Sequence, residues 1–272
     1  MNNKKRLLIM AALVLGLALG SVGIAYAITY GEPDGDGHPY VGFVAFYDAD
    51  GAYKWRCSGT LISPTVFLTA GHCTYGPASA RVWFDPDLND LAKPYPNCGD
   101  HTCYTGTPHP HPGYDDFATF PNTSDVGVVI LDEAVEMETY GELPELGALD
   151  GLTTERGHQD LIIRSVGYGL QCVKPVYQAD KIRYTSTSMI VNVGSHVTDG
   201  YNLHTSNNPG DGHGTSGGSC SGDSGGPLFY PEDSNVVVAV VSFGMNANCK
   251  GADFSYRVDI PNSVDFIEGY LE

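Results

Sequence analysis

The stretch Cys220-Ser221-Gly222-Asp223-Ser224-Gly225-Gly226-Pro227 is the most specific motif in this chain of 272 residues. Its glycines let the backbone turn so that two N–H groups point at one spot, an arrangement that stabilises a developing oxyanion. Ser224 would stand beside that spot as a nucleophile. A flexible Gly/Ser linker is the alternative interpretation, but linkers rarely carry a Cys, an Asp and a Pro in this order. The stretch therefore predicts a nucleophilic serine with an oxyanion site.

A histidine motif, Thr69-Ala70-Gly71-His72-Cys73, precedes the serine motif and follows a β-rich run. Cys57 and Cys73 flank His72, and a disulfide between them would contribute about 3 kcal/mol by the loop-entropy model. An imidazole held rigidly at the end of a strand can serve as a general base. Alone, a histidine is more simply read as a packed or surface side chain, so its role depends on the other motifs.

An acidic residue, Asp125, lies between these two motifs and directly precedes the apolar run 126–131. A carboxylate at the start of a buried strand is partly desolvated and needs a partner, for which an imidazole N–H is suitable. Taken alone, Asp125 fits equally well as a turn-forming residue. Its position between the histidine and the serine motif favours the catalytic interpretation.

Together the three motifs resemble those of the trypsin/chymotrypsin-like serine peptidases, in the chain order His, Asp, Ser of that family. Two further stretches are similar to the family's Gly-Trp-Gly turn and to its substrate-binding strand: Val166-Gly167-Tyr168-Gly169 and Val241-Ser242-Phe243-Gly244. The resemblance covers most of residues 28–272, although loops such as 85–122 are peculiar to this chain.

The resemblance implies a serine endopeptidase that uses a Ser-His-Asp triad and an acyl-enzyme intermediate. In that family pattern Ser224 attacks the peptide carbonyl, His72 transfers the proton, and Asp125 orients the imidazole. Backbone N–H groups of Gly222 and Ser224 would form the oxyanion hole. Main-chain groups of Ser242 and Gly244 would bind an extended substrate as an added strand. The implied disulfides are Cys57–Cys73 and Cys220–Cys249.

Chain order and integrity of the motifs bear on the rival functions. An α/β-hydrolase needs a histidine after its nucleophile, and none follows His213. Gly212-His213-Gly214-Thr215 is similar to a subtilisin motif, but the α/β alternation of that fold is absent. A non-catalytic secreted binding protein on a peptidase fold is a second hypothesis, which an intact triad disfavours. Esterase or transpeptidase use of the same triad is a third, because the acyl-enzyme chemistry is shared.

Hydrophobic patterning predicts an all-β fold. Short β-rich runs, separated by clusters of Gly, Pro, Asn and Asp, lie at residues 41–47, 66–70, 80–84, 126–131, 161–166, 188–193 and 236–243. The family resemblance implies two packed antiparallel six-stranded β-barrels, roughly residues 28–140 and 158–260, with the active site in the cleft between them. Val264, Ile267 and Leu271 have helical spacing, with Pro261 near its start, which predicts a C-terminal helix over 261–271.

The first 27 residues form a separate segment. Lys4, Lys5 and Arg6 precede an almost wholly apolar run, and Ala25-Tyr26-Ala27 has the small residues of a signal-peptidase site. A transmembrane anchor is the alternative, since the run is near spanning length. We expect cleavage after residue 27 and a secreted, extracellular protein.

The net charge of −18 makes anionic partners unfavourable, and the few Lys and Arg residues argue against a nucleic-acid surface. After removal of residues 1–27, 11 positive residues face 32 negative ones, a net charge of −21. We expect a monomer that has no membrane contact and needs no cofactor. Its partners would be protein or peptide substrates, with a proteinaceous inhibitor as a further kind of partner.

The seven cysteines cannot all pair, so at least one thiol is left over. Cys98 and Cys103 could close a small loop, and Cys172 is the candidate for the unpaired residue. No Cys/His spacing of a structural zinc site is present. The group His109, His111, Asp115 and Asp116 is interleaved with prolines and reads as a loop, so no metal is expected.

Two alternatives remain open for the main specificity pocket. In the family the residue six before the nucleophile lies at the pocket base, and here it is Gly218 rather than an acid. An ungapped count from Tyr256 places Phe254 at the pocket wall, in an apolar or partly filled pocket with Asp253 in solvent. A one-residue slip would instead aim the Asp253 carboxylate into the pocket, where it would pair with Arg or Lys.

The resemblance also implies an activation step. Members of the family expose an Ile or Val amine that inserts beside the Asp preceding the catalytic Ser. Signal cleavage at Ala27|Ile28 would itself yield Ile28-Thr29-Tyr30-Gly31. We expect the Ile28 amine to pair with Asp223 without a separate zymogen step, because an unpaired buried carboxylate costs several kcal/mol.

Overall fold

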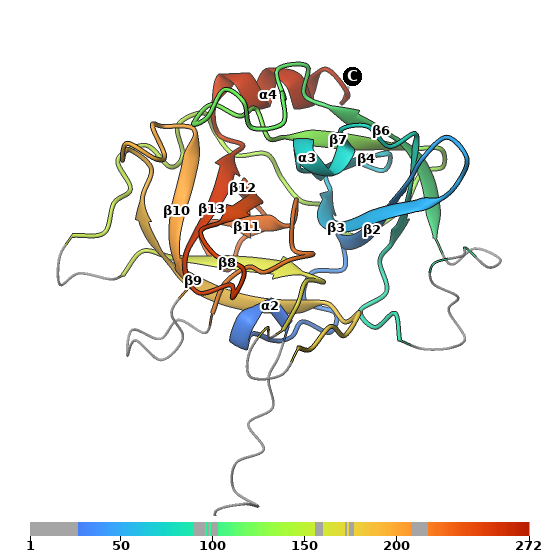
Figure 1. Ribbon diagram of the computed structural model, residues 1–272, viewed down its shortest axis with the longest axis horizontal. Coiled ribbons are helices and arrows are strands. Elements are labelled where there is room, and N and C mark those ends of the chain that lie inside the picture. Colours follow the sequence, from blue (N-terminus) through green and yellow to red (C-terminus); the bar gives the residue numbers. More distant parts are fainter. Residues whose placement is uncertain are drawn as a thin grey trace, which may run out of the picture.

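The computed structural model describes residues 27–89, 96, 98, 103–155, 160–171, 173, 177–207 and 217–271. Within this part the chain forms mostly antiparallel strands, with three short helices (Figure 1). The segments expected to form the signal peptide, the unpaired Cys172 and the 212–215 stretch lie wholly or almost wholly outside the described residues. No helix of the described residues is long and apolar enough to cross a membrane.

Six strands close the first barrel in the order β2-β3-β4-β7-β6-β5. They are β2 (Val41–Tyr47), β3 (Tyr53–Leu61), β4 (Val66–Thr69), β5 (Ser79–Trp83), β6 (Tyr104–Pro110) and β7 (Gly127–Leu131). Valine, isoleucine and phenylalanine recur in β2, β4 and β7, which suits the pleated and half-buried surface of a strand. The one-turn helix α3 (Gly71–Thr74) follows β4 directly.

Six further strands close the second barrel, because β8 pairs with both β11 and β9. They are β8 (Ile162–Gly167), β9 (Tyr184–Asn192), β10 (Asn202–Asn207), β11 (Pro227–Phe229), β12 (Val237–Gly244) and β13 (Gly251–Arg257). Helix α4 (Pro261–Glu268) follows β13, with Pro261 in its first turn and Val264 and Ile267 buried. The two-barrel fold and the C-terminal helix are thus confirmed.

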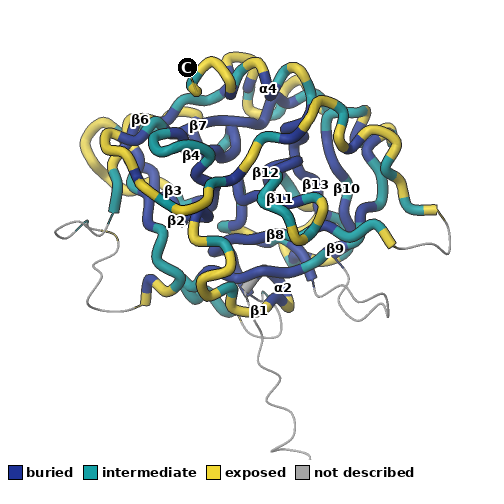
Figure 2. Tube along the Cα trace, turned by 180° about the vertical axis from the view of Figure 1, so that it is seen from behind, coloured by how far each residue is buried: buried dark blue, intermediate teal, exposed yellow. Residues whose placement is uncertain are grey.

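The barrels pack against each other through one hydrophobic cluster. It joins Val44 and Leu68 of the first barrel with Val166, Phe229 and Val240 of the second. Figure 2 shows the buried segments at the centre of the molecule and the exposed loops around its rim. The segments that carry the histidine, aspartate and serine motifs therefore meet over a shared hydrophobic core.

The N-terminal residues differ from their expected place. The turn α2 (Ala27–Tyr30) and β1 (Glu32–Pro33) pack on β9 of the second barrel, although residue 28 was expected to begin the first. Thr29 forms a bridge with Gly218, and Ile28 is fully buried beside Tyr184. The start of the described chain thus crosses to the other half before it enters β2.

The same N-terminal arm is held by a buried ion pair. Arg183 donates from Nε to Asp34 Oδ2 at 2.8 Å, and His38 Nδ1 lies 2.5 Å from Asp34 Oδ1. Arg183 is fully buried and also donates to the carbonyl oxygens of Val41 at 3.1 Å and Gly35 at 2.5 Å. Every nitrogen of this buried guanidinium is therefore satisfied.

Six strands were not expected from the hydrophobic patterning: β1, β3, β6, β10, β11 and β13. Strand β10 reads NLHTSN and β6 reads YTGTPHP, and neither has an apolar alternation. Their backbone groups are satisfied by neighbours far away in the sequence, as in the pairing of β10 with β13. Such pairing overrides weak local propensity.

Candidate active site

Asp125 and His72 form a direct pair at the junction of the two barrels. His72 Nδ1 lies 2.9 Å from Asp125 Oδ2, and the backbone N–H of His72 donates to Asp125 Oδ1 at 2.7 Å. Asp125 is fully buried at the entrance to β7, whereas the His72 side chain keeps 23% exposure. The carboxylate therefore fixes both the backbone and the ring of His72 and leaves one ring edge accessible.

Ser242 gives Asp125 a second partner. Its hydroxyl donates a short hydrogen bond to Asp125 Oδ2 from strand β12. Burial alone would raise the pKa of Asp125, but the attraction of His72 and these hydrogen bonds outweigh it and hold that pKa below its usual value. Burial likewise would lower the pKa of His72, and Asp125 raises it above 6.5. The pair thus favours an ionised carboxylate beside a basic imidazole.

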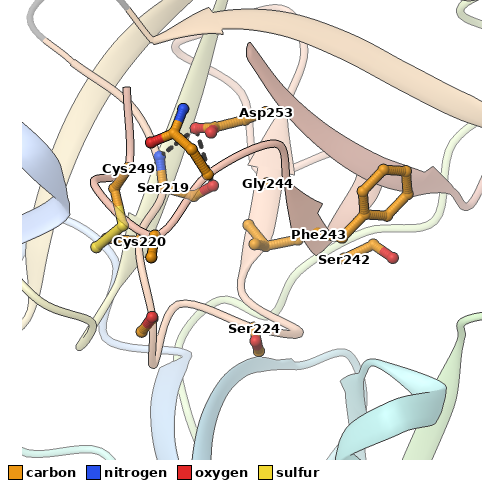
Figure 3. A pocket seen from close by; sticks show the side chains of 12 residues that line it. Ser219, Cys220, Ser224, Ser242, Phe243, Gly244, Cys249 and Asp253 are labelled. Carbon is orange, nitrogen blue, oxygen red and sulfur yellow. Dashed lines mark hydrogen bonds between the residues drawn. A yellow bond between two sulfur atoms is a disulfide. The ribbon is translucent and has the colours of Figure 1, made fainter. Parts of the chain in front are cut away.

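Ser224 lines a cavity of about 290 Å³ together with Ser242 and Asp253. Figure 3 shows Ser224 and Asp253 at opposite ends of this space. Ser224 and the His72 ring share no hydrogen bond among the described residues. Ser242 lines the same cavity as Ser224, and its hydroxyl donates to Asp125, the carboxylate that contacts His72. A contact between nucleophile and base is often loose without substrate.

The loop around Ser224 (residues 220–226, called the oxyanion loop below) has the backbone shape that an oxyanion site needs. Gly222 has a φ of 99° and Gly225 a φ of 74°, in the region that favours glycine. A Cβ on Gly225 would lie 2.0 Å from Thr69 Oγ1, so this glycine also permits close approach to the first barrel. Gly226 N–H donates to the Asp223 carbonyl at 2.7 Å and closes the turn.

Asp223 is buried beneath this loop. Its two carboxylate oxygens accept the backbone N–H groups of Gly169 at 2.7 Å and Cys220 at 2.9 Å. A Cβ on Gly169 would lie 2.2 Å from Asp223 Oδ2, which explains the glycine in this turn. Burial outweighs the hydrogen bonds and raises the pKa of Asp223 to about 7. A cationic partner at this place would stabilise the ionised form.

Ile28 is not joined to Asp223 in this structure. Its nitrogen is in peptide linkage to Ala27, and no hydrogen bond connects the two residues among those described. The neighbouring Thr29 nevertheless contacts the pocket wall, since its hydroxyl donates to Asn207 Oδ1 at 2.9 Å. The N-terminal arm thus lies against the same loop.

Asp253 lies inside the cavity, and this bears on the two alternatives for the specificity pocket. Strand β13 pairs Asp253 with Gly244 and Phe254 with Phe243. Asp253 is 4% exposed and lines the cavity, whereas Phe254 stacks on Phe243 at 4.9 Å and is not part of the lining. Asp253 thus lies at the cavity and not in solvent, while Phe254 packs on Phe243; that Asp253 contacts a basic side chain of the substrate stays a prediction.

The surroundings of the Asp253 carboxylate leave one oxygen unused. Oδ2 accepts the Ser219 N–H at 2.8 Å, the Ser219 hydroxyl at 3.0 Å and Asn207 Nδ2 at 3.0 Å (Figure 3). Oδ1 accepts no hydrogen bond from the described residues. Burial raises the pKa of Asp253 to about 6. A Cβ on Gly218 would lie 2.7 Å from Asp253 Oδ2, so a side chain at this position would displace the carboxylate, although Gly218 itself is not part of the cavity lining.

Disulfides brace the site from both sides. Cys57–Cys73 joins β3 to α3 beside His72, and Cys220–Cys249 closes the loop that enters the serine motif. These are the two pairings that the family resemblance implies, and Cys98 is bonded to Cys103. The one group of three potential metal ligands among the described residues is Cys57, His72 and Cys73, and its two sulfur atoms are bonded to each other.

The loop histidines have protein partners. His111 Nδ1 accepts the Gly113 N–H at 2.9 Å, its Nε2 lies 3.2 Å from the Asn262 carbonyl oxygen, and its ring packs on Phe266 at 4.9 Å. His109 packs on Tyr270 at 5.2 Å. Both rings therefore brace helix α4 against β6 and the loop after it.

Sequence reasoning missed three residues that shape the site. Ser58 contacts the oxyanion loop, and Asn207 and Ser219 hold the Asp253 carboxylate. Ser219 lies beside the serine motif and Ser58 directly follows Cys57, so proximity to a motif was the available signal. Asn207 gave no such signal, because it reaches the site only through strand pairing.

Comparison with known proteins places these features in context. The family model described as Trypsin matches residues 31–267. Brachyurin of Leptuca pugilator is 26% identical over 200 residues, which cover 71% of this chain and 78% of that protein. CLIP domain-containing serine protease B10 of Anopheles gambiae is 24% identical over 246 residues, covering 79% of this chain but only 62% of that protein.

Solved structures share the fold at lower identity. HL collagenase superposes with a TM-score of 0.66 at 19% identity, covering 90% of this chain and 98% of that one. Human heparin binding protein superposes with a TM-score of 0.63 at 20% identity, covering 90% and 96%. At such identities the likeness supports the fold alone.

Proposed function

Because the chain belongs to the Trypsin family of serine proteases, we propose that it is a secreted endopeptidase that cleaves peptide bonds through Ser224, His72 and Asp125. The observation that carries this proposal is the buried Asp125–His72 pair, which lies next to the cavity that contains Ser224. A carboxylate that is buried, ionised and bonded to an imidazole is the arrangement that a general base requires.

Each residue has a defined step in the reaction. His72 Nε2 accepts the Ser224 hydroxyl proton as Ser224 Oγ attacks the substrate carbonyl, and His72 then donates that proton to the leaving amine. Asp125 stabilises the imidazolium that forms in between. The N–H groups of Gly222 and Ser224 stabilise the oxyanion, where each donor contributes about 3 kcal/mol. In the second half, water attacks the Ser224 ester while His72 accepts a proton from it. His72 then returns this proton to Ser224 Oγ, and the acid product leaves.

The position of Asp253 supports a preference for Arg or Lys immediately before the scissile bond. Its Oδ1 accepts no hydrogen bond from the described residues, and Asp253 lines the cavity, where its carboxylate would accept a hydrogen bond from a guanidinium or ammonium group. The main-chain groups of Ser242 and Gly244 line the same cavity and would pair with an extended substrate. Gly218 leaves room for the Asp253 carboxylate, which a Cβ at that position would displace.

Activation would follow export. Signal cleavage after Ala27 would free the amine of Ile28, and that amine would pair with the buried Asp223 carboxylate. The raised pKa of Asp223 in the uncleaved chain supports this step, since burial of the carboxylate outweighs both its hydrogen bonds and the charge of Arg56, so that a further cation would stabilise the ionised form. The mature protein would act outside the cell as a monomer on protein or peptide substrates, subject to proteinaceous inhibitors.

A serine-directed phosphonate probe tests the proposal. Wild-type protein should be labelled on Ser224 and should lose peptidase activity in proportion, and Ser224→Ala should not be labelled. Labelling that persists in Ser224→Ala would contradict the assignment of the nucleophile. A wild type that neither reacts with the probe nor cleaves any peptide of a broad library would favour the binding-protein hypothesis.

A further inference from the structure

A second cavity of about 290 Å³ lies on the other side of the oxyanion loop. Its walls include Tyr53, Trp55, Arg56, Leu170, Tyr177 and Gly222. It shares Ser221 with the cavity that contains Asp253 and Ser224, so the two spaces flank the serine motif. The chain therefore has a binding space next to the nucleophile that the proposed chemistry does not use.

The guanidinium of Arg56 gives this cavity its chemical character. It lies over the Phe43 ring at 5.6 Å, and a Cβ on Gly222 would lie 3.6 Å from both its Nε and its Nη2. No ion pair of Arg56 is found among the described residues, although its charge acts on the buried Asp223 carboxylate and lowers the pKa of that group. Lys54 lines the same cavity, and its Nζ lies 3.9 Å from the half-buried Asp48 carboxylate.

Two cations in one cavity are unusual for this chain. The protein has 14 Lys and Arg residues against 32 Asp and Glu residues, and the first 27 residues contain three of the 14. Arg56 and Lys54 thus form a local positive group on a protein whose net charge is strongly negative. Their field would attract an anionic group to a surface that otherwise repels one.

The direction of the substrate places this cavity after the scissile bond. With the substrate carbonyl at the Gly222 and Ser224 N–H groups, the preceding side chain enters the cavity of Asp253. The chain after the bond leaves on the opposite side of Ser224, where Gly222 and β3 form the second cavity. Arg56 directly precedes Cys57, whose disulfide holds β3 beside His72.

We propose that this cavity binds an acidic side chain of the substrate, one or two residues after the scissile bond, through Arg56. The inference rests on the proposed peptidase function and adds a specificity-determining residue to it. A guanidinium matches a carboxylate with two parallel hydrogen bonds, and the tyrosine and tryptophan rings of the wall pack against the methylene groups of Glu. The substrate class is therefore a peptide with a basic residue before the bond and an acidic residue after it.

Matched peptides test this subsite. Two sets of three internally quenched peptides share Arg before the bond. Within each set the varied residue is Glu, Gln or Lys, at the first position after the bond in one set and at the second position in the other. We expect kcat/KM for the Glu peptide to exceed that for Gln by about fivefold, the upper range for a partly exposed charge pair, and Lys to be poorest. The Glu/Gln ratio should fall as NaCl is added, because salt screens the pair.

Variants then assign the effect to Arg56. Arg56→Gln should bring the Glu/Gln ratio close to one, and Arg56→Lys should keep part of it. Arg81→Gln is the matched control, since Arg81 lies on the outside of the same barrel over Tyr47 and should leave the ratio unchanged. Equal cleavage of the Glu and Gln peptides by wild type, or an unchanged ratio in Arg56→Gln, would overturn the inference.

Binding separates this inference from the proposed function. In Ser224→Ala the uncleaved Glu peptide should bind more tightly than the Gln peptide by calorimetry, whether or not the wild type turns over. If Arg56→Gln does not fold, the wild-type ratio and its salt dependence still decide. If phosphonate labelling fails while the Glu peptide binds selectively, the peptidase proposal is wrong and the acidic subsite stands.

Discussion

The hydroxyl of Ser58 donates a hydrogen bond to the carbonyl oxygen of Gly222 at 3.0 Å, from one barrel to the other. The same oxygen of Ser58 accepts the backbone N–H of Tyr168 at 3.0 Å, and Ser58 is fully buried. The backbone N–H of Ser58 in turn donates to the Ser224 carbonyl at 2.8 Å. One serine of the first barrel thus holds three backbone positions around the proposed oxyanion hole.

Ser58→Ala should lower kcat with little change in KM. Without the hydroxyl, the Gly222 carbonyl loses the bond that holds it, so the backbone torsions of Gly222 are less restrained and its N–H, in the preceding peptide unit, is aimed less well at the oxyanion. We expect a loss of about 10-fold in kcat, less than the 10²–10³ for deleting an oxyanion donor. The affinity of a peptide boronate, which mimics the tetrahedral adduct, should fall in parallel with kcat.

Ser186→Ala is the matched control for that experiment. Ser186 is also a buried strand serine, but its hydroxyl has no hydrogen-bond partner among the described residues. Its removal should leave kcat, KM and boronate affinity unchanged. Equal effects of the two substitutions would show that Ser58 acts only through general stability.

Asp125→Asn should both slow the enzyme and shift its pH profile. His72 must be neutral to act as a base, so the rate falls as the pH drops through its raised pKa. Removing the negative charge lowers that pKa, so the acid limb should move to lower pH. Turnover should fall by about 10⁴, because the ring also loses its orienting acceptor. An acid limb that does not move would contradict the coupling of the two residues.

Asp253→Asn should remove the preference for basic substrates. The change keeps the size of the side chain but removes the charge that would attract Arg or Lys. Comparison of matched Arg, Lys, Phe and Leu substrates should show a loss of at least about 10-fold for the basic pair only. In the wild type the same preference should weaken below pH 6, where Asp253 becomes protonated. Basic substrates that are poor for both proteins would rule out the acidic pocket.

One extra alanine before Ile28 should abolish most activity. In this extended form the amine would lie one residue too early to reach Asp223. For the wild type, mass spectrometry of the mature protein should show Ile28 as its first residue. Full activity of the extended form would exclude this mechanism. On the alkaline side, the activity of the mature form should fall only when the amine loses its proton.

The extended form should also differ in stability. Without the amine, Asp223 holds its proton more tightly in the folded than in the unfolded chain, so stability falls as the pH rises from 3.8 to about 7. The mature form should lose less over that range, because the ion pair lowers the pKa of Asp223. Thermal unfolding of both forms at pH 5 and pH 8 measures the difference. Identical pH dependence would argue against the ion pair.

Arg183→Met should destabilise the protein by about 3–5 kcal/mol, because it leaves Asp34 and several carbonyl groups buried without this donor. Arg164→Met provides the comparison, since its partner Asp233 is 85% exposed. That surface pair should be worth about 0–1 kcal/mol. Unfolding in urea measures both. Similar losses in the two variants would contradict the role assigned to the buried pair.

The triad motifs could be recognised in the sequence because each is a local turn whose shape depends on its own residues. His72 and Ser224 stand next to glycines and cysteines, and Asp125 precedes an apolar run. The same local logic located β2, β7 and helix α4. It could not find β10 or β13, which are polar or mixed and are held mainly by pairing with distant strands.

The pocket could not be settled from the sequence, because it depends on a register. Whether Asp253 or Phe254 faces the substrate follows from the pairing of Asp253 with Gly244. Ser58 and Arg56 escaped attention for a related reason. Ser58 is 164 residues from Gly222 in the chain, so its role arises only when the two barrels meet.

The two ends of the chain differ in how freely they can be handled. Residues 27–33 lie against β9 and the pocket wall, while α4 lies at the opposite pole of the molecule (Figure 1). A purification tag or fusion partner placed directly before Ile28 would occupy the amine of that residue and so prevent its proposed pairing with Asp223. No residue of α4 lines either cavity, so recombinant protein intended for kinetics should carry its tag beyond this helix rather than before Ile28.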